Sequence, residues 1–106
     1  ALRRNRLHGA AREVDEVLLI SPDDESMLGY RGWIAEHHGR HDDAWADYLR
    51  AAEMGNAWSQ YRVGLRLHKG TQPNVARNEA KGLAWIRRAA AQHHDKAIQY
   101  LKATGR

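Results

Sequence analysis

The chain contains no cysteine and no phenylalanine, and only two of its 106 residues are proline. The lack of cysteine excludes a disulfide scaffold, a zinc site with thiolate ligands and a cysteine nucleophile. The lack of phenylalanine leaves four tryptophans to supply much of the bulky apolar packing. No apolar run is longer than that of residues 17–20, which is far shorter than the roughly 18 residues of a membrane span. The sequence therefore predicts no membrane-spanning segment, and the basic residues near its start precede no signal-peptide core.

Charge is distributed unevenly along the chain, although the net charge is only +4. Residues 23–56 carry eight acids and three arginines, whereas residues 57–106 carry ten lysines and arginines and two acids. The middle therefore has a net charge of −5 and the C-terminal half has one of +8. Such a polarised surface favours charged partners and predicts an acidic protein or peptide for the basic half.

The sequence repeats itself at an interval of 34 residues and again at one of 38 residues. A period in this range is typical of stacked helical hairpins, because one hairpin cannot bury its own apolar face. The equivalent positions are Ala10, Ala44 and Gly82; Val14, Tyr48 and Ile86; and Val17, Ala51 and Ala89.

Apolar spacing and helix-breaking residues divide the chain into helices over about residues 7–19, 25–38, 43–54, 57–69, 79–92 and 95–103. Asp42 is the predicted N-cap of the third helix, and Gly55 and Gly70 are predicted stops for the third and fourth. No stretch alternates like a strand. The sequence therefore predicts an all-α fold, a right-handed α/α solenoid of stacked antiparallel hairpins. Small residues at Gly32, Ala44, Gly64 and Gly82 are expected where helices cross closely.

Residues 43–64 closely resemble the Sel-one-like repeat family, most specifically at the junction Ala51-Ala52-Glu53-Met54-Gly55-Asn56-Ala57. Residues 81–92, followed by Ala97 and Leu101, resemble the same family. The earlier part is similar to the related tetratricopeptide repeat through Gly32, Gly39, Ala44, Tyr48 and Ala51. The chain departs from the family pattern at His93 and Lys102, where glycine is usual, and at Gly82, where alanine is usual. The resemblance implies a single repeat domain over residues 1–106.

In this family the first helix of each hairpin lines the concave surface, where partners bind. The resemblance therefore implies a protein-interaction module, an adaptor or scaffold that binds a partner peptide or domain there. The matching residues are Trp33, Glu36, His37, Trp58, Tyr61, Leu65, His68, Lys96 and Gln99.

The fourth helix has two apolar stripes, although a helix buried on one face needs only one. The second stripe either fills space between hairpins or binds a partner, since tryptophan and tyrosine pack and bind with the same atoms. The first stripe is Gln60, Val63, Gly64 and Leu67, and the second is Trp58, Tyr61, Leu65 and His68.

Two alternative functions remain open. Arg62, Arg66 and Lys69 lie on one side of the fourth helix and, with nearby aromatics, suit nucleic-acid binding. The basic residues that follow them are Arg77, Lys81, Arg87 and Arg88. The acidic middle of the chain opposes that interpretation, because it repels phosphate. The second alternative is a self-assembling homo-oligomer, in which the acidic middle of one copy meets the basic end of another.

No enzyme activity, metal or cofactor is expected. The seven histidines include His38 and His41, which a turn brings close enough to share an ion, but histidines near helix C-termini are also explained by the helix dipole. No serine stands in a nucleophile elbow, and no glycine-rich loop suits a phosphate. The acidic pairs at 23–24 and 42–43 stand where helices begin.

The first helix carries an apolar stripe of Leu7, Ala11, Val14 and Leu18 but has only one neighbour in the sequence. A stacked helix normally needs a second neighbour or a polar outer face. We therefore expect the chain to be a piece of a longer solenoid or to cover this stripe by self-association.

Overall fold

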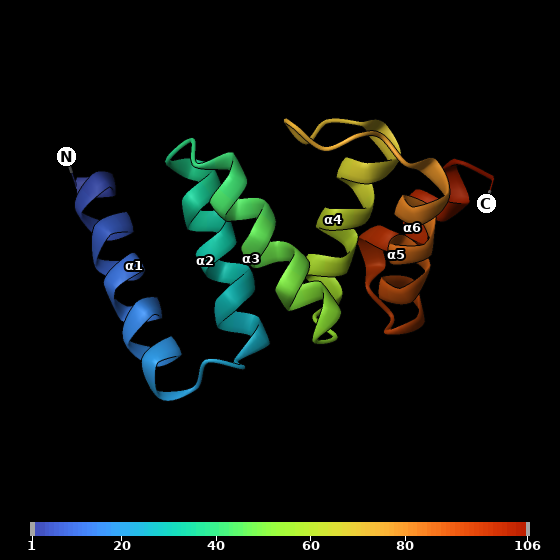
Figure 1. The fold of residues 1–106 in the computed structure, drawn as a ribbon. Coiled ribbons are helices and arrows are strands. Elements are labelled where there is room, and N and C mark those ends of the chain that lie inside the picture. The colour runs from blue at the N-terminus through green and yellow to red at the C-terminus, as the bar shows by residue number, and fades with distance from the viewer. Residues whose placement is uncertain (1, 106) are drawn as a thin grey trace.

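The computed structural model describes residues 2–105, and the side chains of residues 9–105. This part of the chain forms six helices and no strand, which confirms the predicted all-α fold. Successive helices run in opposite directions and pack on one another in chain order, so they form an elongated row of 42 × 25 × 23 Å (Figure 1). The right-handed sense of the stack stays a prediction. The helices are α1 (Leu2–Ile20), α2 (Glu25–His37), α3 (His41–Glu53), α4 (Ala57–Lys69), α5 (Glu79–Ala91) and α6 (Asp95–Ala103).

In each of the two central hairpins, α2/α3 and α4/α5, the two helices cross at an equivalent glycine. A Cβ on Gly32 in α2 would lie 2.9 Å from Cδ1 of Tyr48 in α3, and one on Gly64 in α4 would lie 2.5 Å from Cγ1 of Ile86 in α5. Tyr48 and Ile86 occupy the same position of the repeat, and both are fully buried. The prediction that small residues allow close helix crossing is confirmed.

The apolar stripe of α1 packs against α2. Val14 and Leu18 are 2% and 8% exposed and form one apolar cluster with Leu28 and Ile34. Val14 and Leu18 therefore need no second neighbour, because the stripe faces α2. That the chain is a piece of a longer solenoid or self-associates stays a prediction. The side chain of Leu7, assigned to the same stripe, lies outside the described side chains.

Three helices begin at side chains that cap them. Asp24, Asn56 and Asn78 each accept a hydrogen bond from the backbone N–H three residues further on, at 3.0, 2.8 and 3.0 Å. The third helix begins instead after Arg40, whose side chain makes no capping bond. The prediction of Asp42 as its N-cap is therefore wrong, and this acid lies in the first turn, where the helix dipole favours it.

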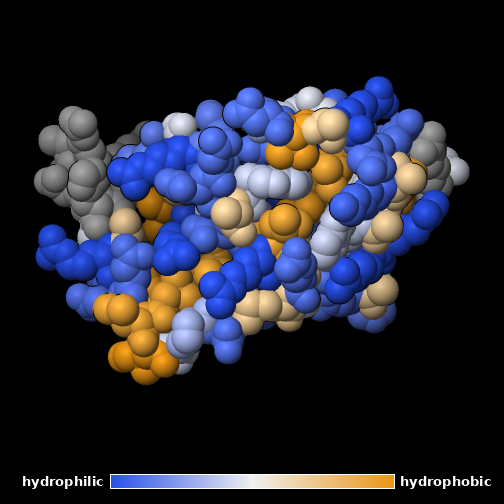
Figure 2. Space-filling view, in the orientation of Figure 1, coloured by the Kyte–Doolittle hydropathy of each residue, from blue (hydrophilic) through white to orange (hydrophobic). Residues whose placement is uncertain are grey.

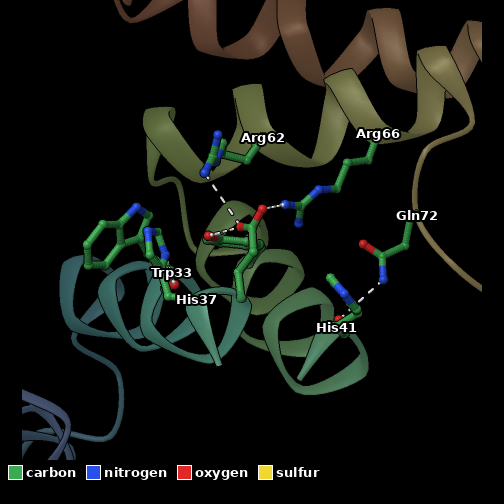
Figure 3. Close-up of polar contacts among 8 residues, drawn as sticks. Trp33, His37, His41, Arg62, Arg66 and Gln72 are labelled. Atoms are coloured by element: carbon green, nitrogen blue, oxygen red, sulfur yellow. Dashed lines mark hydrogen bonds and ion pairs between the residues drawn. The ribbon is translucent and has the colours of Figure 1, made fainter. Parts of the chain in front are cut away.

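Side-chain amides tie the hairpins together at the end where α3 and α5 finish. Nε2 of Gln92 donates to the carbonyl of Gly55 and to Oε1 of Gln60, both at 2.9 Å. Nε2 of Gln60 donates in turn to the carbonyl of Ala52 at 3.1 Å. At the opposite end of the hairpins, Gln72 of the loop after α4 donates to the carbonyl of His41 (Figure 3). These bonds hold α4 in a fixed position relative to α3 and α5.

Candidate partner-binding face

Side-chain contacts connect α2 with α4 and α4 with α6. These three helices therefore share one face of the molecule, which we name the α2/α4/α6 face. Arg62 and Arg66 of α4 point across to α2, where both pair with Glu36 (Figure 3). On the other side of α4, His68 reaches Tyr100 of α6. The residues predicted to bind a partner therefore come from helices that lie next to one another in space, although they are not consecutive in sequence.

A polar cluster occupies the α2 and α4 part of this face and is named here the Glu36 cluster: Glu36, Tyr48, Arg62 and Arg66. Oε2 of Glu36 accepts a hydrogen bond from the Tyr48 hydroxyl at 2.7 Å, and Oε1 accepts one from Arg66. Nη2 of Arg62 lies 3.5 Å from Oε2, at the limit of a hydrogen bond. Tyr48 and Arg66 thus make the strong hydrogen bonds to Glu36, and Arg62 is held less tightly by the same carboxylate.

The protonation states in this cluster follow from its bonds. Burial would raise the pKa of Glu36, but the Tyr48 hydroxyl and the two arginines lower it by more, so the net shift is downward. Burial and the bond to Glu36 raise the pKa of Tyr48 far above its ordinary value. At neutral pH the cluster therefore has one carboxylate, two guanidinium groups and a neutral phenol, with a net charge of +1.

An aromatic groove, lined by Ser26, Tyr30, Trp33, Asn56 and Trp58, opens beside the Glu36 cluster. It is a shallow depression of about 440 Å³ between α2 and the start of α4. The rings of Tyr30 and Trp33 stack at a centroid distance of 5.9 Å, and Trp58 meets Tyr48 edge-on at 5.4 Å. The groove walls are therefore supported by neighbouring rings and present their outer faces to solvent.

Arg62 joins the groove to the Glu36 cluster. Its guanidinium carbon lies 5.0 Å from the ring centroid of Trp58 and 5.8 Å from that of Tyr48. Its side chain is 31% exposed, and its Nε has no hydrogen-bond partner. Stacking on two rings orients this cation without satisfying all its donors.

The structure divides the predicted binding residues into two groups. In the first group, Trp33 and Trp58 line the aromatic groove and Glu36 lies in the Glu36 cluster. The His37 ring packs on that of Trp33, with a centroid distance of 3.9 Å. Sequence reasoning did not assign Tyr30 to the site, although its spacing of three residues from Trp33 places both on one side of a helix.

The remaining predicted residues face or belong to α6. The ring of Tyr61 lies 5.2 Å from that of His94, and Leu65 packs against the apolar cluster around Ala97. Nδ1 of His68 lies 2.5 Å from the Tyr100 hydroxyl. These side chains attach α6 to α4. Lys96 and Gln99 are exposed on α6.

The basic residues considered for nucleic-acid binding have partners within the protein. Arg62 and Arg66 pair with Glu36. Arg77 donates to the His68 carbonyl at 2.9 Å, and Arg88 lies 4.5 Å from the ring centroid of Trp85. These contacts reduce the number of free cations that could meet a phosphate backbone.

A second, more polar cavity of about 480 Å³ lies between α1, α2 and α3. Nε and Nη2 of Arg31 each donate a hydrogen bond to the Asp47 carboxylate at 2.9 Å, and Nη1 lies 3.6 Å from Oδ1 of Asp15 in α1. The bond to Asp47 raises the pKa of Arg31 despite partial burial. These ion pairs line the cavity and hold α1 to the hairpin formed by α2 and α3.

The described residues include no group of three or more histidines and acids placed to hold a metal ion. The described helices also include none that is long and apolar enough to cross a membrane. Comparison with protein-family models, with curated proteins and with solved structures finds no match. Function must therefore be inferred from the shape and charge of the α2/α4/α6 face.

Proposed function

We propose that this chain is a protein-interaction module of the tetratricopeptide and Sel-one-like kind, which holds a partner segment on the α2/α4/α6 face. The observation that carries the proposal is the aromatic groove, which Tyr30, 39% exposed, lines together with two tryptophans. Aromatic side chains around a shallow depression are typical of binding hot spots, because they bury large areas without losing much conformational freedom.

The chemistry of the groove indicates the partner. An apolar side chain fits between the rings of Trp33 and Trp58, where it displaces water from apolar surface. Arg62 stacks on Trp58, is 31% exposed and is held only at the limit of a hydrogen bond to Glu36, so its planar guanidinium suits a carboxylate of the partner. We therefore expect a partner peptide with an acidic residue close to an apolar one.

Peptide display on the immobilised full chain tests this proposal. We expect peptides with adjacent apolar and acidic residues to be enriched, and Tyr30→Ala to lose their binding. Met54→Ala is the matched control, since Met54 is 37% exposed against 39% for Tyr30 but does not line the groove. Arg62→Gln should keep apolar binding and weaken the preference for acids. Equal binding to the wild type and to Tyr30→Ala would contradict the proposal.

A further inference from the structure

The exposed large apolar side chains of the described residues gather at one edge of the molecule. At this edge α1 and α3 end and α2 and α4 begin, and Figure 2 shows an apolar area over the lower end of α1. Leu19 and Ile20 stand out, at 84% and 85% exposed. Neighbouring apolar side chains exposed to this degree mark an interaction surface. The exposed large apolar side chains of the described residues are Val17, Leu19, Ile20, Tyr30 and Met54.

The end of α1 and the turn after it have the composition that the aromatic groove favours. Leu19 and Ile20 are followed within four residues by Asp23, whose side chain is 82% exposed. Backbone hydrogen bonds from Ser21 to Val17 and from Asp24 to Ser21, at 2.8 and 3.1 Å, hold the segment in shape. A segment that is already ordered loses little entropy when it docks.

We propose that this segment, residues 19–23, is inserted into the aromatic groove of a second copy of the chain. The inference rests on the proposed function, because it names the partner of the same groove. Leu19 and Ile20 of one copy pack between the rings of the other, and Asp23 pairs with Arg62 of the other copy. The present contact of Asp23 with Arg50 is 3.4 Å long and exposed, so exchanging it costs little.

The position of the two elements favours a reciprocal dimer. The segment precedes α2, and the groove is lined by Ser26 and Tyr30 of α2, so both lie at the same edge. A two-fold dimer uses the same patch on both copies, and a patch that contains both the inserted and the receiving element is self-complementary. Each dimer then contains two identical contacts.

Sedimentation velocity of the full chain over a wide concentration range tests this inference. We expect the wild-type mass to rise from 12.1 kDa towards twice that value with concentration. The double variant Leu19→Ser/Ile20→Ser and the groove variant Tyr30→Ala should each stay monomeric. Ala84→Ser, at an exposed position of α5, is the control and should behave as the wild type.

Mixing the two monomeric variants separates loss of contact from loss of fold. The double variant keeps an intact groove and Tyr30→Ala keeps an intact segment, so the mixture should form a heterodimer through one contact, more weakly than the wild type. A wild type that stays monomeric, a double variant that still dimerises, or a mixture without recovery would overturn the inference. If peptides from display bind a monomeric wild type, this inference fails while the proposed function stands.

Discussion

Arg66 in α4 binds Oε1 of Glu36 in α2, and so joins two helices that are separated in sequence by the whole of α3. The two side chains are only 15% and 25% exposed. Removing the carboxylate would leave two arginines together without their counter-charge. This pair is therefore expected to stabilise the face that carries the aromatic groove.

Glu36→Gln should lower the free energy of unfolding by about 1–3 kcal/mol, the usual effect of losing a partly buried hydrogen-bonded charge. Chemical denaturation monitored by circular dichroism measures this change. Glu13→Gln, at an exposed position of α1, is the control and should have an effect within about 0.5 kcal/mol. Equal stability of the two variants would mean that the Glu36 cluster contributes nothing to the fold.

The effect of Glu36→Gln should also depend on pH. The pKa of Glu36 in the folded chain lies below its ordinary value of 4.5, so the unfolded chain takes up the proton first as the pH falls. The stabilisation is complete above pH 4.5 and is lost as the pH drops through the lowered pKa. The stability difference between wild type and variant should shrink over that interval, and a constant difference would contradict this account.

We expect His94 to give stability a second pH dependence, at higher pH. Burial lowers its pKa, and the charge of Lys96 lowers it further. The unfolded chain, in which the pKa is near 6.5, therefore binds the proton more readily than the folded chain. The free energy of unfolding should fall as the pH drops below 6.5, and His94→Gln should make this dependence less steep. An NMR titration of the His94 ring in the folded protein that gives a value at or above 6.5 would contradict the prediction.

Two glycine substitutions should have opposite effects on stability. Gly64→Ala should destabilise by about 1–3 kcal/mol, because the added Cβ would lie 2.5 Å from Ile86 and 2.7 Å from the carbonyl of Gly82. Gly9→Ala in α1 should stabilise by up to about 1 kcal/mol, since its Cβ would meet nothing within 4 Å among the described residues. Thermal melting of both variants measures the contrast. A Gly64→Ala protein as stable as the wild type would show that α4 and α5 do not approach closely at Gly64.

The sequence predicts the helices and their crossings because both follow local rules. Repeat spacing aligns Tyr48 with Ile86, and small residues stand opposite them at Gly32 and Gly64. The start of α3 differs from the predicted one, although aspartate is normally a better cap than arginine. The helix begins directly after the turn at Gly39, where the Arg40 N–H donates to the Ala35 carbonyl at 2.9 Å.

The candidate site was predictable only in part. The aromatic residues Trp33 and Trp58 stand out as surplus to a single buried face, but the pairing of Glu36 with Arg66 does not, because the two are thirty residues apart. Tyr48 in particular occupies a core position of the repeat, and nothing in its spacing shows that its hydroxyl reaches Glu36. Such contacts depend on the distance between helices, which the apolar pattern alone does not determine.

The most direct test of the central claim uses the four tryptophans as reporters. Trp33 and Trp58 line the aromatic groove, whereas Trp45 and Trp85 belong to α3 and α5 and do not line it. Side-chain indole N–H signals of the full chain should be followed by NMR as a peptide selected by display is added. We predict that the signals of Trp33 and Trp58 shift with the peptide and those of Trp45 and Trp85 do not. Shifts confined to Trp45 and Trp85, or no shift at all while the peptide binds, would contradict the account.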